Sequence, residues 1–347
     1  MAKQQFGYVK KRKAMNRIHE TQWVLTYQCG LNAASEYCSL GSHAQNEANL
    51  EQKIQAIEIF EKIGVSNIKL LGGNPTDLPE IDEIIVALNE STISFVVTDN
   101  AMNGPKILAI AKKIVFKKNS GFFFSLDFLD ENLTNSIGGC SVVKTKAAIK
   151  LIPKLVDLVP LLGVNTVVHA KNLDELPKIL AWITKLGGYM NLCLLIWGKW
   201  DKFLYRTADR EFALRPEHRP KVEQIMAILL EMKRHGYHLA CSEKYIVSLA
   251  KVCCRDDCFG WNCGHLSNCP LLRVNSDLSL MICSDLQGNQ VKNFKLDDLL
   301  DPAKYATFQQ TWLNDNDRLY CASRHGCYWS NVWRAADNFE EGGSFVK

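Results

Sequence analysis

Six short apolar runs alternate with helical patterns between residues 22 and 196, and this alternation constrains the fold more than any other feature. The runs are rich in branched and aromatic residues and cover residues 23–28, 66–71, 92–98, 121–127, 164–170 and 189–196. Strands that are each followed by a helix imply a parallel sheet with right-handed crossovers. Six such units are too few for a closed eight-stranded barrel. The sequence therefore predicts a partial, open (β/α)6 barrel, with a doubly wound α/β sheet as the alternative.

Apolar side chains at helical spacing separate these runs. They predict helices at 44–63, 79–89, 103–115, 142–162, 173–186 and 217–235. Gly64, Gly163 and Gly187 are expected to end the helices at 44–63, 142–162 and 173–186. Pro153 is expected to kink or split the helix at 142–162. The loop from Trp197 to Arg215 is long for a compact domain and suggests either a substrate-contacting lid or a solvated insertion.

The residue pattern of the chain changes after residue 250. Cysteines, turns and short β-like runs replace the alternation, and residues 271–277 and 278–283 resemble a hairpin around Asn275-Ser276-Asp277. A short helix is expected at 302–313. We therefore expect three parts: a basic extension at 1–20, the barrel at 21–240 and a small cysteine-rich module at 241–347.

Composition is that of an ordinary globular enzyme, with 47% hydrophobic and 22% charged residues in 347. The net charge of +4 is concentrated in Lys10-Lys11-Arg12-Lys13 and Arg17, a run typical of a solvated terminus or of a contact with nucleic acid or an acidic partner. No stretch approaches the roughly 20 apolar residues of a membrane span, and no signal-peptide core precedes the first strand. A cytoplasmic protein is expected.

Thirteen cysteines are present, and nine of them lie between Cys241 and Cys327. In a cytosolic chain of this size, clustered cysteines indicate metal or iron–sulfur ligation rather than disulfides. Cys193, in an apolar run, is expected to be a small buried hydrophobe.

Two further thiols, Cys29 and Cys38, follow the first predicted strand and lie at the carboxyl end of the first βα unit, where α/β folds place their chemistry. Ser35 stands between them, where a third metal-binding cysteine would complete the set. Thiolates are soft ligands suited to iron–sulfur clusters, and a serine hydroxyl is a poor substitute. A lost third ligand, natural or engineered, two unrelated thiols, and completion by another cysteine are the alternatives.

This segment resembles the cluster loop of the radical S-adenosylmethionine (SAM) superfamily. Cys29-Gly-Leu is similar to the family's Cys-Asn-Leu opening, and Glu36-Tyr37-Cys38 to its Cys-x-aromatic-Cys closing. The resemblance implies that Cys29 and Cys38 hold a [4Fe–4S] cluster whose open iron chelates SAM, and that Tyr37 lies near the adenine. Gly72-Gly73-Asn74-Pro75, at the end of the second predicted strand, is similar to the family's Gly-Gly-Glu-Pro motif, which contacts the SAM amino group.

Other predicted strand ends carry polar residues that suit the same resemblance. Thr98-Asp99-Asn100 ends the third strand, where the family often has Thr-Asn-Gly. Ser125 and Asp127 end the fourth, where such residues commonly approach the SAM ribose or the substrate, and His169 closes the fifth. Their convergence on one edge predicts a pocket.

The C-terminal cysteines resemble the start of the auxiliary-cluster modules called SPASM or twitch domains, which begin Cys-Pro and run through a hairpin to a second cysteine. By this resemblance, one further [4Fe–4S] cluster would be held by Cys269, Cys283, Cys321 and Cys327. A ligand could instead come from other cysteines of the module, which could also serve a second site: Cys253, Cys254, Cys258 and Cys263. A structural zinc site is a further alternative, since four thiolates also suit Zn²⁺.

The resemblance implies a radical SAM enzyme that cleaves SAM to methionine and a 5′-deoxyadenosyl radical, which abstracts hydrogen from a peptide, protein or small-molecule substrate. Its electron donor would be a flavodoxin or ferredoxin. Two alternatives come from other classes: a catalytically inactive relative that only binds, motivated by Ser35 and Asn74, and a zinc-stabilised nucleic-acid-binding protein, suggested by the basic N-terminus.

Overall fold

A nine-stranded, mostly parallel sheet frames the computed structural model, which describes residues 20–31, 38, 46–130, 132–133, 139–195, 211–252, 272–281 and 290–314. Within that part of the chain, the strand order is β6-β5-β4-β3-β2-β1-β7-β8-β9. The strands are β1 (Glu20–Thr26), β2 (Asn67–Gly72), β3 (Ser94–Asp99), β4 (Gly121–Ser125), β5 (Leu161–Val168), β6 (Tyr189–Leu194), β7 (Leu272–Val274), β8 (Ser279–Met281) and β9 (Gln290–Lys295).

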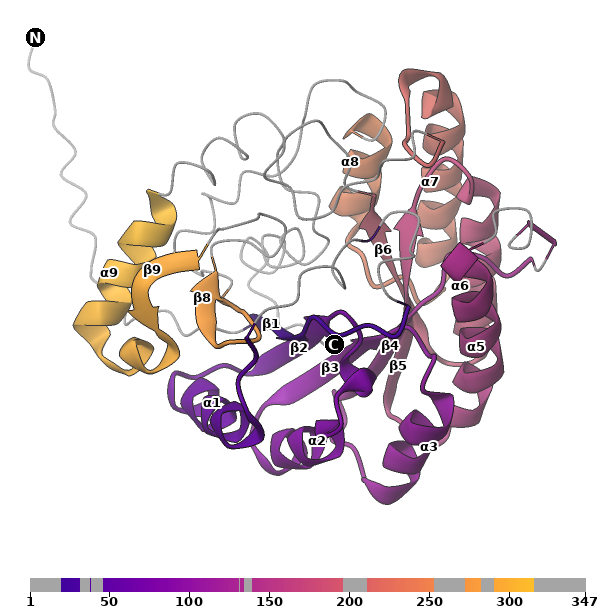
Figure 1. Ribbon diagram of the computed structural model, residues 1–347. Helices are drawn as coiled ribbons and strands as arrows, with labels where there is room; N and C mark the ends of the chain where they lie inside the picture. The colour runs from indigo at the N-terminus through magenta and orange to yellow at the C-terminus, as the bar shows by residue number, and fades with distance from the viewer. Residues whose placement is uncertain are drawn as a thin grey trace, which may run out of the picture.

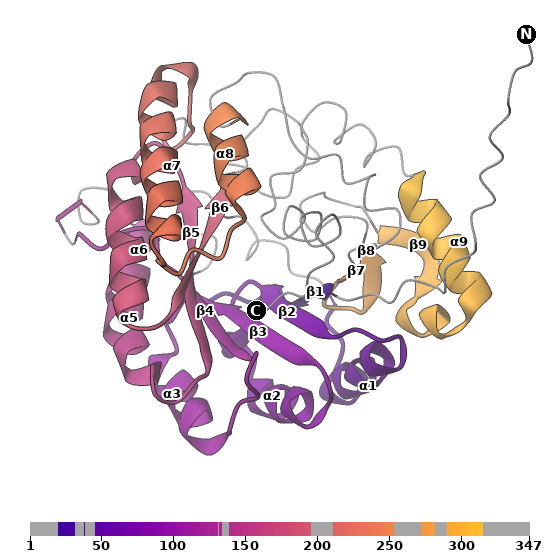
Figure 2. The same ribbon diagram turned by 180° about the vertical axis from the view of Figure 1, so that it is seen from behind.

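Helices connect the six parallel strands and lie along the outer face of the curved sheet (Figure 1). They are α1 (Leu50–Lys62), α2 (Ile81–Glu90), α3 (Gly104–Lys113), α5 (Gly139–Leu155), α6 (Leu176–Lys185) and α7 (Arg219–Arg234). Seen from behind, the strands curve like part of a barrel wall, with β6 at one end and β1 toward the other (Figure 2). The sheet is open rather than closed, which confirms the predicted partial (β/α)6 barrel.

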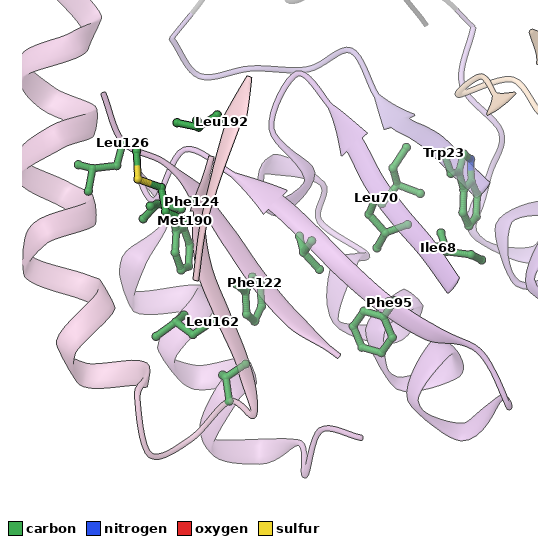
Figure 3. Packing of buried hydrophobic residues seen from close by; sticks show 14 of the residues in the cluster. Trp23, Ile68, Leu70, Phe95, Phe122, Phe124, Leu126, Leu162, Met190 and Leu192 are labelled. Carbon is green, nitrogen blue, oxygen red and sulfur yellow. The ribbon is translucent and has the colours of Figure 1, made fainter. Parts of the chain in front are cut away.

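The main hydrophobic core lies between the sheet and these helices. Alternate residues of each strand point outward to it, as the period of two in a strand requires. Figure 3 shows Trp23, Ile68, Leu70, Phe95 and Phe122 sharing this layer, and all five are 0% exposed. The inner face of the sheet is thereby left to the other residues of each strand.

Helix α1 begins at a capping box, in which the Asn49 side chain accepts from the Gln52 N–H and the Gln52 side chain accepts from the Asn49 N–H. This fixes the point where the loop after β1 turns into the helix. Two hydrogen bonds of 2.9 Å hold the box together.

The structure differs from the sequence prediction at several points, and the helix predicted at 44–63 begins only at Leu50. The helix predicted at 142–162 is α5, which ends at Leu155, two residues after Pro153. Gly163 does not end it: this glycine lies inside β5, where an added Cβ would meet the Phe123 ring at 2.5 Å. Helix α8 (Glu243–Val252) packs on α7 and has no counterpart in the predicted elements.

The predicted hairpin is confirmed by β7 and β8, which pair antiparallel with Val274 opposite Leu280. Leu278, in its turn, adopts a φ of 65°, a left-handed conformation that glycine takes at less cost. The predicted helix at 302–313 is α9 (Pro302–Leu313), whose N-terminal N–H groups are capped by Asp301.

The hairpin also extends the barrel sheet. Strand β7 runs parallel to β1 with Gln22 opposite Arg273, and the Arg273 guanidinium donates a hydrogen bond to the Gln22 side-chain oxygen. The Ala48 N–H, just before α1, donates to the Ser276 carbonyl at 2.8 Å. Gln22 and Arg273, 251 positions apart along the chain, therefore lie side by side in β1 and β7.

No helix among the described residues is both long enough and apolar enough to span a membrane.

Candidate functional site

The candidate site lies at the carboxyl ends of β1, β2 and β3, where Cys29 follows the first strand. The chain leaves β1 through a turn that Glu47 fixes. One Glu47 carboxylate oxygen accepts from the Thr26 hydroxyl at 2.7 Å and from the Tyr27 N–H at 2.9 Å. The Gln28 N–H donates to the Thr26 hydroxyl at 2.9 Å. Cys29 is thus held in place by its own strand and by the segment that precedes α1.

The two glycines at the end of β2 allow the backbone of β2 to press against this turn. The Gly73 N–H donates to the Thr26 carbonyl at 2.8 Å, and the Asn74 N–H donates to the Gln28 carbonyl at 2.7 Å. A Cβ on Gly72 would lie 2.2 Å from the Thr26 oxygen, and one on Gly73 would lie 2.1 Å from the Gln28 oxygen. The close approach that glycine makes possible here is therefore to the loop that carries Cys29.

Asn74, which follows the glycines, uses its side chain inside the protein. The residue is 0% exposed. Its amide nitrogen donates to the Thr76 hydroxyl at 3.1 Å and to the Asp77 carboxylate at 2.8 Å, and its oxygen accepts from the Asn100 N–H at 3.0 Å. In this geometry the amide ties the end of β2 to the end of β3. Pro75 is buried beside it and begins the short 3-10 helix Pro75–Asp77.

Asp77 links the same network to the cysteine loop. One carboxylate oxygen accepts from the Gly30 N–H at 2.6 Å, directly after Cys29. The other accepts from the Asn74 and Asn103 amides, at 2.8 and 2.5 Å. A carboxylate that receives N–H groups from three segments holds those segments in register.

Asp99, at the end of β3, is fully buried and accepts from the Thr76 hydroxyl at 2.6 Å and from the Ala101 N–H at 2.8 Å. Burial raises the pKa of this carboxyl to about 6, and the hydrogen bonds from Thr76 and Ala101 oppose that rise.

Cys29 itself is half-buried. The Asn100 side-chain nitrogen lies 3.9 Å from the Cys29 sulfur. Burial raises the pKa of the thiol, while a hydrogen bond from the Leu31 backbone and the charge of Lys144 lower it. The sulfur thus faces two N–H donors.

Cys38 lies next to the C-terminal hairpin. It packs against a small apolar cluster formed by Val24, Tyr27 and Met281. Burial, together with the charges of Asp277 and Glu47, raises the pKa of Tyr27 to about 12. One predicted ligand therefore faces β2 and β3, while the other faces β8.

Ser125 and Asp127 lie where expected, at the carboxyl end of β4. Ser125 is opposite Asn165 of β5, on the inner face of the sheet. Asp127 is 4% exposed, and its carboxylate accepts from the Val167 N–H at 2.8 Å. That contact joins the ends of β4 and β5.

His169 closes β5 as predicted but is 0% exposed. Its ring lies between those of Phe128 and Phe212, with centroids 5.4 and 5.0 Å away. Nδ1 accepts from the Lys171 N–H at 3.2 Å. Burial, together with the charges of Lys171 and Lys144, lowers the pKa of His169 to about 3, so that the ring is neutral.

The remaining predicted site residues, Ser35 and Tyr37 in the cysteine loop and Cys269, Cys283, Cys321 and Cys327 of the C-terminal module, lie outside the described residues. Among those that are described, no group of three His, Cys, Asp or Glu side chains is arranged to hold a metal ion. The donor chemistry of Cys29 still suits a cluster, since a half-buried sulfur with N–H donors is the usual environment of an iron–sulfur thiolate.

Four residues of the site were not singled out from the sequence, namely Glu47, Thr76, Asp77 and Asn103, whereas Asn100 was named there at the end of the third predicted strand. Asn100 could be found from the sequence, because it directly follows the third predicted strand, and the carboxyl ends of parallel strands share one edge of the sheet. Asp77 and Asn103 lie in short connecting turns and carry no signal of their own.

Comparison with known proteins shows a family to which the barrel part of the chain is similar. Residues 23–183 match the model of the radical SAM superfamily. A probable GTP 3′,8-cyclase from Pyrococcus abyssi (strain GE5 / Orsay) is 27% identical over 171 residues, which are 48% of this chain and 54% of that protein. The chain thus spans about half the length of this curated relative.

Solved structures show the same fold over most of the chain. Streptococcus suis SuiB superimposes with a TM-score of 0.60 at 17% identity, covering 92% of this chain and 74% of SuiB. The structure of native anSMEcpe with bound AdoMet and Cp18Cys peptide gives 0.55 at 12% identity, covering 93% and 97%. SuiB bound to the precursor peptide SuiA gives 0.59 at 15% identity, covering 92% and 73%. Over residues 23–183, which carry most of the open parallel sheet, this chain is similar to the radical SAM superfamily.

Proposed function

We propose that this protein is a radical SAM enzyme that binds a [4Fe–4S] cluster through Cys29 and Cys38 and SAM beside Gly72–Pro75. The observation that carries the proposal is the joining of the Cys29 loop to the glycine turn of β2, through backbone hydrogen bonds of 2.8 and 2.7 Å. The similarity of residues 23–183 to the superfamily supports the activity. When bound, the cluster would supply one electron to SAM and yield methionine and a 5′-deoxyadenosyl radical.

The residues of this chain would then orient the reactants and exclude water. Glu47 and Asp77 hold the two ends of the Tyr27–Gly30 turn, so that the Cys29 sulfur keeps a fixed position above β2 and β3. Ser125 and Asp127, at the end of β4, are the candidates for contacts with the ribose of SAM or with the substrate, and Tyr37 is the candidate for the adenine. His169 supports the edge from within the core, because its ring is wholly buried.

A peptide is the substrate class that we favour among peptides, proteins and small molecules. SuiB has been captured with a precursor peptide and anSMEcpe with a peptide, and both folds cover more than nine-tenths of this chain. We further propose that residues 241–347 form an auxiliary module with a second [4Fe–4S] cluster or a zinc ion at Cys269, Cys283, Cys321 and Cys327. A flavodoxin or ferredoxin in the cytoplasm would be the electron donor.

A second candidate is a relative that binds substrate without radical chemistry. It is favoured by Asn74, whose amide makes hydrogen bonds with Thr76, Asp77 and Asn100. At this position the family motif has a glutamate, in the segment that contacts the SAM amino group. Ser35 in the cysteine loop favours it too, since two thiolates hold a cluster weakly.

The experiment compares wild-type protein with Ser35→Cys after anaerobic reconstitution with iron and sulfide, and measures 5′-deoxyadenosine formed from SAM. We expect Ser35→Cys to form at least about tenfold more than wild type, by the usual cost of weakening a metal site. Adding Cys29→Ala should abolish the product, whereas adding Cys193→Ala, on β6, should not. Intact clusters in the Ser35→Cys protein with no product would favour the binding protein. Zinc alone, without iron–sulfur absorption in either protein, would remove the proposal.

A further inference from the structure

The side chain of Asn100, just after β3, contacts the sulfur of Cys29. Among the described residues, Asn100 places a side-chain donor on the sulfur of a candidate cluster ligand, with its Nδ2 3.9 Å from Cys29 Sγ. That distance is within the range for a hydrogen bond to sulfur. Asn100 is 7% exposed, so the contact is shielded from competing water.

The orientation of the Asn100 amide is fixed by its other contacts. Its Oδ1 accepts from the Met102 N–H at 3.0 Å, which only the oxygen of the amide can do. The nitrogen is therefore the atom that faces Cys29. The backbone N–H of Asn100 donates to the Asn74 Oδ1 at 3.0 Å, and Asn74 is in turn held by Thr76 and Asp77.

This arrangement also gives a reason for asparagine at position 74. The site is wholly buried, and the Asn74 amide nitrogen lies 2.8 Å from the Asp77 carboxylate. A glutamate there would bring a second carboxylate against Asp77, which is costly in a buried position. An amide instead accepts from Asn100 and donates to Asp77, and so aligns β3 with the cysteine loop.

We propose that Asn100 is a positioning residue that donates a hydrogen bond to the Cys29 thiolate and so raises the reduction potential of the cluster bound there. Hydrogen bonds to the sulfurs stabilise the more negatively charged, reduced cluster and are among the factors that set such potentials. Asn74 holds Asn100 in register. This inference rests on the proposed function, because it needs a cluster on Cys29.

The test uses the full-length Ser35→Cys protein, with Cys269 and Cys283 replaced by alanine so that only the cluster at Cys29 is measured, and two further substitutions in it. Asn100→Leu keeps the side-chain size and removes the donor to Cys29. Asn103→Leu is the matched control: its amide belongs to the same network, donating to Asp77 and to the Thr76 carbonyl, but not to the sulfur. The readouts are the midpoint potential of the cluster, followed by electron paramagnetic resonance, and the rate of iron loss to a chelator.

With Asn100→Leu, we expect a midpoint potential more negative than that of the parent and of Asn103→Leu, and iron loss about tenfold faster than in the parent. Equal potentials in a cluster-loaded Asn100→Leu and its parent would overturn the inference while leaving the proposed function intact. An equal negative shift in both variants would also overturn it, since the effect would then belong to the network as a whole. If the parent binds no cluster, the proposed function fails and the inference fails with it.

Discussion

Replacing Gly73 by alanine is expected to destabilise the protein by about 3 kcal/mol, the upper end of the usual cost of overpacking, and to prevent cluster loading. The new Cβ would lie 2.1 Å from the Gln28 oxygen and 2.6 Å from the Tyr27 oxygen. Both neighbours are backbone atoms of the turn before Cys29, so the clash cannot be relieved by rotating a side chain. The turn must move, and Cys29 must move with it.

Gly104→Ala is the matched control. Its Cβ would meet only the Leu151 side chain at 3.7 Å, an ordinary van der Waals contact, in the first turn of α3. Urea unfolding and iron content, measured on both variants, check the prediction. An ordinary substitution changes the free energy of unfolding by about 1 kcal/mol. If Gly73→Ala changes it by no more than that, and the variant loads iron normally, the close approach is not required.

His169 is expected to make the fold sensitive to acid. Its folded-state pKa is about 3, below the ordinary value of 6.5, because the neutral ring is buried. A base whose pKa is lowered by folding contributes stability that is complete above its unfolded pKa and is lost as the pH falls toward the folded pKa. Between pH 7 and pH 5 this loss amounts to about 2 kcal/mol for a single group.

The Asp99 carboxyl works in the opposite direction over the same range. Folding raises its pKa to about 6, so the folded state takes up a proton as the pH falls from 7 to 5, and this offsets part of the loss. The measurement therefore compares two proteins. Between pH 7 and pH 5, the free energy of unfolding of wild type should fall by about 2 kcal/mol more than that of His169→Phe. Equal pH dependence in the two proteins would contradict a buried, neutral histidine.

Local pattern predicts the barrel well, because every strand and helix is amphipathic or apolar at its own period. The six strands from Trp23 to Leu194 are found where the pattern predicts them, within a few residues at each end. The error at Gly163 has a local cause: the apolar run around it continues the helical pattern, and only the strands on either side of β5 decide the outcome.

Long-range pairing is what the sequence does not reveal. The pairing of β7 with β1 joins residues 251 positions apart, and the sequence of neither strand indicates which strand it pairs with. Asn74 is another case. Its position after two glycines can be read from the sequence, but its hydrogen bonds to the Thr76 and Asp77 side chains and from the backbone N–H of Asn100, just after β3, cannot. Hydrogen-bond networks at strand ends can be assigned only once the structure shows which strand ends lie next to each other.

The central claim is that the loop after β1 holds an iron–sulfur cluster that SAM approaches. The most direct measurement is the electron paramagnetic resonance spectrum of the reconstituted, dithionite-reduced protein before and after SAM is added, with and without Cys29→Ala. To isolate this loop, Cys269 and Cys283 are replaced by alanine in all samples. We predict a reduced [4Fe–4S] signal that SAM alters and that Cys29→Ala removes. A signal that is indifferent to both SAM and Cys29→Ala, or a protein that binds zinc and no iron, would contradict the account.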